Sequence, residues 1–278
     1  MTQKNLEIPG HFTVSNDQQL TFFAGMNVLE NSDIALTVAR TLNDIATRNG
    51  FKLVFKVSWD KANRTSAASY RGVPMDLAKA FFTELRDVTA MPIVTDIHEP
   101  YQAQELAPFV DVLQIPAFLV RQTDLIEAAC RTGRPLLLKK MQMMSPAEGL
   151  RVVRKCGGFG HDNVAICERG TVFGYHNLVV DMLVFGAFKR AGVPAVFDVS
   201  HALQTPGSAL ESTGGRGERT WELATAAVSQ GIAGVFVECH PNPAEALCDG
   251  PCATPLGEME ALMTHLFRLD EYIKGLSR

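Results

Sequence analysis

Short apolar runs recur along the chain, and between them apolar residues return with a helical period. Each run is four to six residues long and is bounded by Gly, Pro or charged residues. Runs that are apolar at nearly every position are typical of parallel strands buried on both faces by helices. Eight runs are predicted to be strands: Leu20–Ala24, Lys52–Val57, Pro92–Thr95, Val110–Ile115, Pro135–Leu138, Val164–Cys167, Ala195–Val199 and Ala233–Glu238.

The stretches between these runs favour helices. In Ser32–Arg48 the apolar residues follow the helical period, Asn31 supplies a capping side chain, and Gly50 follows as a stop signal. The predicted helices are Ser32–Arg48, Pro74–Thr89, Tyr101–Ala107, Gln122–Arg131, Pro146–Lys155, Asn177–Arg190, Glu218–Gln230 and Leu256–Ile273. Each of them lies between two predicted strands or follows the last one.

This alternation predicts a closed (β/α)8 barrel, the TIM barrel fold, with residues 1–278 forming one domain. A doubly wound open sheet is the alternative, but no GxGxxG motif follows the first strand. Residues 1–19 precede the first strand, and we expect them to form an N-terminal extension or a small hairpin under the barrel.

Polar residues gather where the predicted strands end. In a barrel of this kind, catalytic groups lie at the carboxyl ends of the strands. The opposite ends carry turn residues instead, such as Met91-Pro92 and Val193-Pro194. This asymmetry predicts an enzyme. In chain order, the polar residues at the carboxyl ends are Asn27, Lys56 with residues 60–66, Asp96 with His98 and Glu99, Gln114, Lys139 with Lys140, Glu168 with Arg169, Asp198 with His201, and Glu238 with His240 and Asp249.

Composition excludes several other classes of protein. The 278 residues include 26 Lys or Arg and 30 Asp or Glu, a net charge of -4, so the basic surplus of a nucleic-acid binder is missing. The apolar runs are too short to span a membrane, and the N-terminal residues lack the apolar stretch of a secretory signal. We therefore expect a cytoplasmic protein that binds neither nucleic acid nor membrane.

Several cations at one end of a slightly acidic protein indicate an anionic substrate. Up to six basic side chains stand at the carboxyl ends of the strands, and such a set needs a ligand with several negative charges. The alternative is that individual lysines are solvated strand ends paired with nearby acids. The six are Lys56, Lys61, Arg64, Lys139, Lys140 and Arg169.

The remaining polar residues leave the chemistry open. The acids and His201 suit either acid–base catalysis or a divalent ion. The six cysteines are expected to be buried thiols, because the cluster of Cys239, Cys248 and Cys252 lacks the paired CxxC spacing of structural zinc. Covalent catalysis through Ser200 or Cys239 is disfavoured, since neither lies in a GxSxG elbow.

Specific strings then resemble one family, the 3-deoxy-D-manno-octulosonate 8-phosphate synthases. The resemblance extends over roughly residues 20 to 260, and its most specific strings are KANR at 61–64, PAFLVRQTDL at 116–125 and CDGP at 248–251. It also includes GMNVLE at 25–30, SYRG at 69–72, TDIHE at 95–99, FGY at 173–175, NLVVDM at 177–182, FDVSHALQ at 197–204 and HPNP at 240–243.

The resemblance implies a reaction and a set of binding roles. Phosphoenolpyruvate would condense with D-arabinose 5-phosphate and water to give the eight-carbon sugar acid phosphate and inorganic phosphate, for lipopolysaccharide biosynthesis. The phosphoenolpyruvate phosphate would be held by Lys139 and Arg169, and its carboxylate would face Lys61. The remaining substrate-binding residues implied are Gln114, Ala117 and Phe118 along the pocket, Asn63 and Asp96 at the sugar hydroxyls, Arg64 and Thr65 at the arabinose phosphate of a neighbouring subunit's site, and Gln204 and Glu238.

The same resemblance implies catalysis without a covalent intermediate, by a homo-oligomer that is a tetramer in this family. We expect His201 and Asp249 to handle the water and the aldehyde oxygen, with Lys56 and Asn27 orienting the aldehyde. Metal-dependent members carry Cys at the position of Asn27, together with equivalents of His201, Glu238 and Asp249. An amide is a poor ligand for zinc or iron, so the metal-independent class, with no metal and no cofactor, is predicted.

Two departures from the family pattern affect loops. The family usually has KKPQF after the fifth strand, where this chain has KKMQM at 139–143, and an Arg common near residues 205–207 is missing. The nearest rival enzyme is 3-deoxy-D-arabino-heptulosonate 7-phosphate synthase, which uses erythrose 4-phosphate and needs a metal and a Cys. A barrel that binds phosphosugars without catalysis is the rival from another class.

Overall fold

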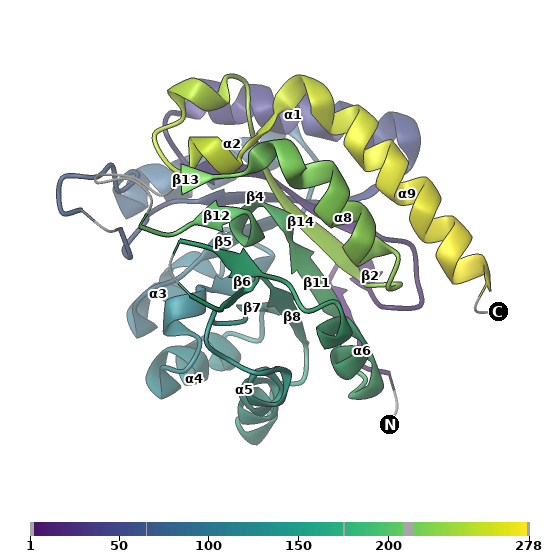
Figure 1. Cartoon of the computed structure of the whole chain (residues 1–278). Coiled ribbons are helices and arrows are strands. Elements are labelled where there is room, and N and C mark those ends of the chain that lie inside the picture. The colour runs from purple at the N-terminus through teal and green to yellow at the C-terminus, as the bar shows by residue number, and fades with distance from the viewer. Residues whose placement is uncertain (1–2, 65, 175, 208–213, 277–278) are drawn as a thin grey trace.

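Eight parallel strands close into a barrel, as predicted. A computed structural model describes residues 3–64, 66–174, 176–207 and 214–276. Each strand pairs with its neighbour along the chain, and the last pairs with the first, which closes the ring (Figure 1). The barrel strands are β3 (Thr21–Val28), β4 (Lys52–Ser58), β5 (Ile93–Asp96), β6 (Val112–Ile115), β7 (Leu136–Lys139), β8 (Val164–Glu168), β11 (Ala195–Asp198) and β14 (Gly234–His240).

Helices cover the outside of the barrel. The C-terminal helix α9 (Met259–Leu276) runs along the outside against α1 and α8 (Figure 1). The one-turn helix α7 (Val199–Ala202) lies at the carboxyl end of β11 and carries His201, whereas the other covering helices are α1 (Ser32–Asn49), α2 (Met75–Val88), α3 (Pro100–Leu106), α4 (Thr123–Arg131), α5 (Pro146–Gly158), α6 (Leu183–Arg190) and α8 (Thr220–Val228). Their buried residues pack on the outward side chains of the strands in one large apolar core.

The N-terminal residues form a hairpin that packs against the inside of the barrel. Strands β1 (Leu6–Ile8) and β2 (Phe12–Val14) pair in antiparallel register. Leu6, Ile8 and Val14 join the inward-facing residues of the barrel strands in a second apolar core. Because this core fills the barrel at the amino ends of the strands, an open cavity can form only toward the carboxyl ends.

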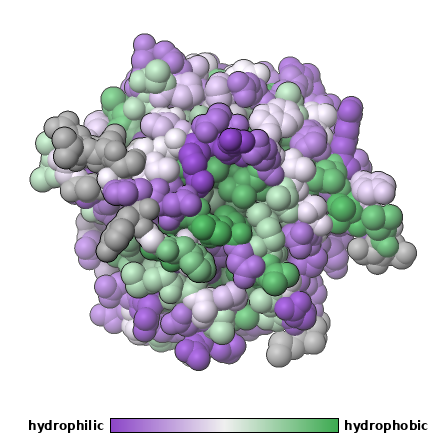
Figure 2. All heavy atoms as spheres, viewed as in Figure 1, coloured by the Kyte–Doolittle hydropathy of each residue, from purple (hydrophilic) through white to green (hydrophobic). Residues whose placement is uncertain are grey.

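The loops contain small elements of regular structure. Two short strand pairs occur there, β9 (Thr171–Val172) with β10 (Leu178–Val179) and β12 (Gln204–Thr205) with β13 (Gly214–Gly215), and one further short strand, β15 (Thr254–Pro255), pairs with β14. The 3-10 turns are η1 (Ala117–Leu119), η2 (Gly217–Arg219), η3 (Pro243–Glu245), η4 (Gly250–Cys252) and η5 (Leu256–Glu258). In Figure 2 apolar residues gather near the centre of the face shown, surrounded by more hydrophilic ones.

Several predicted boundaries differ from the observed ones, and three of these differences lie near the carboxyl ends of the strands. The helix predicted over Asn177–Arg190 begins only at Leu183, where the Asp181 carboxylate accepts the Leu183 N–H, because residues 178–179 pair with β9 instead. The seventh strand ends one residue early, since Asp198 caps the short helix α7. The first strand runs on to Val28, so Asn27 lies inside it.

Candidate active site

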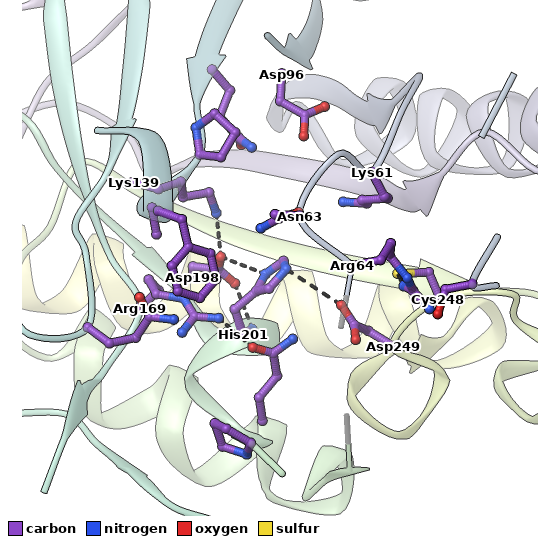
Figure 3. A pocket seen from close by; sticks show the side chains of 18 of the residues that line it. Lys61, Asn63, Arg64, Asp96, Lys139, Arg169, Asp198, His201, Cys248 and Asp249 are labelled. Carbon is purple, nitrogen blue, oxygen red and sulfur yellow. Dashed lines mark hydrogen bonds and ion pairs between the residues drawn. The ribbon is translucent and has the colours of Figure 1, made fainter. Parts of the chain in front are cut away.

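A cavity of about 210 Å³ opens at the carboxyl ends of the barrel strands. The residues lining it include twelve of the side chains predicted for the site: Lys61, Asn63, Arg64, Asp96, Gln114, Ala117, Phe118, Lys139, Arg169, His201, Gln204 and Asp249 (Figure 3). Three more predicted residues, Asn27, Lys56 and Glu238, lie in a buried layer beside it and are not part of the lining. Thr65 falls outside the described residues.

The alternation of strand residues explains why these side chains meet. Along a strand every second side chain points to the same face. Each inward polar residue therefore stands two positions beyond an inward apolar residue of the second core, and together they form a polar layer above it. The apolar and polar pairs are Val54 and Lys56, Val94 and Asp96, Val112 and Gln114, Leu137 and Lys139, Cys167 and Arg169, Val196 and Asp198, and Phe236 and Glu238.

Asn27 joins this layer through an irregularity in β3. Met26 pairs with Val57 and Val28 pairs with Ser58, so Asn27 is an extra residue at a β-bulge. Bulges re-aim side chains and are common beside active sites. The bulge sets the Asn27 amide among the carboxylates of the neighbouring strand and loop.

His201 stands at the centre of a chain of polar contacts. Its Nδ1 lies 2.8 Å from Asp198 Oδ2, and its Nε2 lies 3.9 Å from Glu238 and 4.0 Å from Asp249 (Figure 3). Lys139 also binds the Asp198 carboxylate. Burial alone would raise the pKa of Asp198, but His201 and Lys139 hold that pKa well below its usual range. Asp198 therefore remains an anion that orients the imidazole.

A buried network lies next to His201. Glu238 accepts hydrogen bonds at 2.5 Å from both Lys56 Nζ and Asn27 Nδ2, and Asn27 Nδ2 also donates to Asp249 at 3.1 Å. Lys56 Nζ also donates hydrogen bonds to the carbonyl oxygens of Met26 and Asn27. Burial lowers the pKa of Lys56 to about 8, although Glu238 opposes the shift. Burial would raise the pKa of Glu238, but His201 and Lys56 bring it to about 2.

Lys61 and Asp96 lie across the cavity from His201 (Figure 3). Lys61 donates to Ser58 Oγ at 2.8 Å, and His98 Nε2 lies 3.3 Å from Asp96 Oδ2. Burial would lower the pKa of Lys61, yet Asp96 and Glu238 raise it, so this amine stays protonated. A protonated amine that can donate further N–H hydrogen bonds is suited to binding an anion.

Arg169 also has a hydrogen-bond donor that no described residue uses. Its Nη2 donates to Gln204 Oε1 at 2.5 Å, while its Nη1 is buried and has no hydrogen-bond partner among the described residues. The Gln114 Oε1 atom beside the cavity is likewise buried, and no described residue donates a hydrogen bond to it. Because an unpaired buried polar group is costly, these two atoms indicate where a polar ligand would bind.

The set of six cations needs a correction. Lys61, Arg64, Lys139 and Arg169 line the cavity, whereas Lys56 and Lys140 do not. Lys56 is held by Glu238, and Lys140 points to the opposite face of its strand because it follows Lys139 directly. Arg64 contacts Cys248 Sγ at the rim.

Some residues around the cavity were given no individual role from the sequence. Asp198 was predicted at the carboxyl end of the seventh strand, among the acids suited to acid–base catalysis or a divalent ion, and it lines the cavity two residues beyond the inward-facing Val196. The others come from loops, where no period in the sequence indicates which way a side chain points. They are Ser69, Pro116, Gln142, Pro206, Gly207 and Cys248. All six cysteines lie in the described part of the chain and are buried free thiols.

Comparison with known proteins then identifies the family of the chain. The DAHP synthetase I family matches residues 4–275, nearly the whole length. The chain belongs to that family. Its relatives within the family include proteins named 2-dehydro-3-deoxyphosphooctonate aldolase. One, from Pseudomonas putida (strain GB-1), is 46% identical over 99% of this chain and 98% of its own. Another, from Aliivibrio fischeri (strain MJ11), is 48% identical over 98% and 96%.

A third relative of this name, from Hahella chejuensis (strain KCTC 2396), is 45% identical over 99% of this chain and 97% of its own. In the described part of this chain, no helix is both long and apolar enough to cross a lipid bilayer.

Proposed function

We propose that this protein condenses phosphoenolpyruvate with D-arabinose 5-phosphate and water, giving 3-deoxy-D-manno-octulosonate 8-phosphate and inorganic phosphate. The observation that carries the proposal is full-length similarity to 2-dehydro-3-deoxyphosphooctonate aldolases, at 46–48% identity, in a chain whose barrel end holds a cavity lined by four cations. Both proposed substrates are polyanions, so that lining matches their charge.

Phosphoenolpyruvate is proposed to bind at the Lys139 and Arg169 side of the cavity. The Nη1 atom of Arg169, which has no partner among the described residues, and the Lys139 amine would hold its phosphate, with Gln204 keeping the guanidinium in place. Lys61 would face the carboxylate. The Gln114 oxygen, with Ala117 and Phe118, would border the pocket.

The acceptor sugar is proposed to bind nearer Asn63 and Asp96, whose polar atoms suit its hydroxyl groups. Arg64 would bind a sugar phosphate, together with Thr65. In a single chain Arg64 lines that chain's own cavity, and we propose that in the oligomer it also serves the site of a neighbouring subunit.

The proposed reaction needs no nucleophilic side chain. The enol carbon C3 attacks the aldehyde carbon, water adds at C2, and the C–O bond to phosphate breaks, so that the phosphate leaves with the bonding electrons. His201, oriented by Asp198, and Asp249 would transfer the protons of water and of the aldehyde oxygen. The sequence predicted that Lys56 and Asn27 orient the aldehyde. Because neither residue lines the cavity, we propose instead that they position Glu238 and Asp249.

The residues around Asn27 do not fit a metal ion. A metal joining His201, Glu238 and Asp249 would occupy the space in which the Asn27 amide donates to both carboxylates. An amide N–H cannot serve as a ligand, and the Lys56 ammonium already compensates Glu238. We therefore propose metal-independent catalysis, with no step that passes through a metal.

We also propose that the protein is a homotetramer. The number of subunits rests on the resemblance to the synthase family, and self-association is supported by six exposed apolar side chains around the carboxyl-end loops: Phe118, Met143, Val172, Phe173, Val179 and Leu183. Clusters of this kind mark protein–protein contacts, and a second copy of the chain is the occupant proposed.

The choice of acceptor tests the proposed reaction. Purified protein with phosphoenolpyruvate is expected to release inorganic phosphate with D-arabinose 5-phosphate but not with erythrose 4-phosphate. Preference for erythrose 4-phosphate would instead support the rival seven-carbon synthase. Binding of both substrates without phosphate release would support a barrel that binds phosphosugars without catalysis.

A further inference from the structure

Lys140 is a buried cation that the proposed reaction does not use. Its side chain is 1% exposed and runs against α5 at Gly149, where an added Cβ would lie 2.8 Å from Ile166 Cδ1 and 3.7 Å from Lys140 Cγ. The amine donates to the carbonyls of Met144 and Met141 at 3.0 and 3.2 Å and to Thr171 Oγ1 at 3.3 Å. These bonds fasten the loop that carries Gln142, which lines the cavity.

Glu168 is the partner of Lys140 at the end of β8. Its Oε2 lies 3.4 Å from Lys140 Nζ, and its Oε1 accepts hydrogen bonds from Arg169 N at 3.1 Å and Gly170 N at 2.7 Å. Gly170 has a φ of 90°, which favours glycine. The carboxylate thus fixes the backbone from which the Arg169 side chain reaches the cavity.

Each member of the pair keeps the other charged. Burial raises the pKa of Glu168, and Lys140 opposes that rise. Burial lowers the pKa of Lys140, and Glu168 opposes that fall. The other groups facing the pair are Arg169, Glu148 from α5 and the Cys167 thiol, while β9 contributes only the uncharged Thr171. Without Lys140, Glu168 would take up a proton more readily and become a weaker acceptor for the two backbone N–H groups.

We propose that Lys140 and Glu168 are positioning residues for the phosphate end of the cavity, acting on substrate through the backbone of Arg169 and the loop of Gln142. The inference rests on the proposed role of Arg169 in binding phosphoenolpyruvate. It predicts a specific defect: binding of phosphoenolpyruvate should suffer, and binding of the sugar should not.

The primary test is the Lys140→Met variant, which keeps most of the aliphatic stem. We expect the KM for phosphoenolpyruvate to rise about tenfold, as for the loss of one charge-assisted hydrogen bond, and the KM for D-arabinose 5-phosphate to change less than about twofold. The phosphoenolpyruvate KM of this variant should rise further as the pH falls, because Glu168 then becomes protonated.

Glu168→Gln provides a second variant, since its amide oxygen still accepts the backbone N–H groups. It should show a smaller increase in the phosphoenolpyruvate KM, without the pH dependence. The double variant Lys140→Met with Glu168→Gln should also lack the pH dependence, because the titrating group is gone.

Lys274→Met is the matched control. Lys274 Nζ lies 2.7 Å from Asp270 Oδ1, and Asp270 Oδ2 accepts the Leu20 N–H at 2.9 Å, so this pair also clamps backbone, but at the amino end of β3. This control is expected to lower Tm and to leave both KM values unchanged.

Three results would overturn the proposal. They are a phosphoenolpyruvate KM within twofold of wild type in Lys140→Met, an equal rise for both substrates, or the same change in the Lys274→Met control. If the wild-type protein does not condense the two substrates, the proposed function fails instead. Calorimetric binding of phosphoenolpyruvate to wild type and Lys140→Met then still decides whether the pair positions Arg169.

Discussion

At the scale of single residues, the site depends on charges that hold one another in place. Asp198 has three partners: Lys139, the His201 ring and the His201 backbone N–H, which it accepts at 2.9 Å. Its depressed pKa means that it is ionised throughout the neutral range. The orientation of His201 therefore depends on a charge that a neutral isostere cannot supply.

The first prediction concerns Asp198→Asn. This change should lower kcat by about a hundredfold or more, because the imidazole loses the anion that sets its orientation. Steady-state kinetics at saturating substrates would measure the loss. The control is Asp162→Asn, which removes a carboxylate paired with Lys4 on the surface, and it should be silent. A decrease of less than about threefold in Asp198→Asn would contradict this account of His201.

The second prediction uses the lowered pKa of Lys56. Above a pH of about 8 this amine loses its proton, and Glu238 is left without its cation. The rate should therefore fall on the alkaline side with a midpoint near that pH. When each pH–rate profile is normalised to its own maximum, the alkaline fall should be absent from that of Lys56→Arg, because a guanidinium stays charged. An unchanged alkaline limb in the variant would assign it to another group.

The sequence predicted the site unevenly at this scale. Residues inside strands, such as Lys139 and Gln114, could be placed because the period of two fixes their direction. The partners of a side chain could not be predicted: the period of two separates Lys139, which faces the cavity, from Lys140, but it does not show that Lys140 binds Glu168. Those contacts depend on strands and loops that are distant in sequence.

At the scale of elements, the alternation of strands and helices was predictable because each strand is buried on both faces. The bulge in β3 was not. It arises from pairing with β4, and it extended the strand past the predicted end at Ala24 and brought Asn27 into the barrel. The β9–β10 pair was missed for a related reason, since the apolar residues of the 177–190 segment fit a helix equally well.

The third prediction tests the close approach of β3 and β4. A Cβ at Gly25 would lie 2.1 Å from the Lys56 carbonyl oxygen, so Gly25→Ala must push the two strands apart. We expect Tm to fall by about 5 °C or more, corresponding to a loss of about 2 kcal/mol. Gly257→Ala is the control, because no described atom outside its chain neighbours lies within 4 Å of its added Cβ. Equal Tm values for the two variants would contradict the tight packing described.

At the scale of the whole molecule, the exposed apolar side chains lead to the fourth prediction. Light scattering should give four times the chain mass of 30.4 kDa. Leu183→Glu, at a site 78% exposed in the single chain, should shift the protein to smaller species, because a charge inside an apolar interface is costly. Leu77→Glu, on exposed Leu77 of α2, should not. A monomeric wild-type protein would contradict the proposed assembly.

The proposed reaction is tested by phosphate release from phosphoenolpyruvate and D-arabinose 5-phosphate, measured with and without EDTA. The proposed condensation, with Asn27 in place of a metal, predicts full release in EDTA and one sugar acid phosphate formed per phosphate. Loss of activity in EDTA with recovery on adding a divalent metal would contradict the metal-independent site. No release under either condition would contradict the reaction itself.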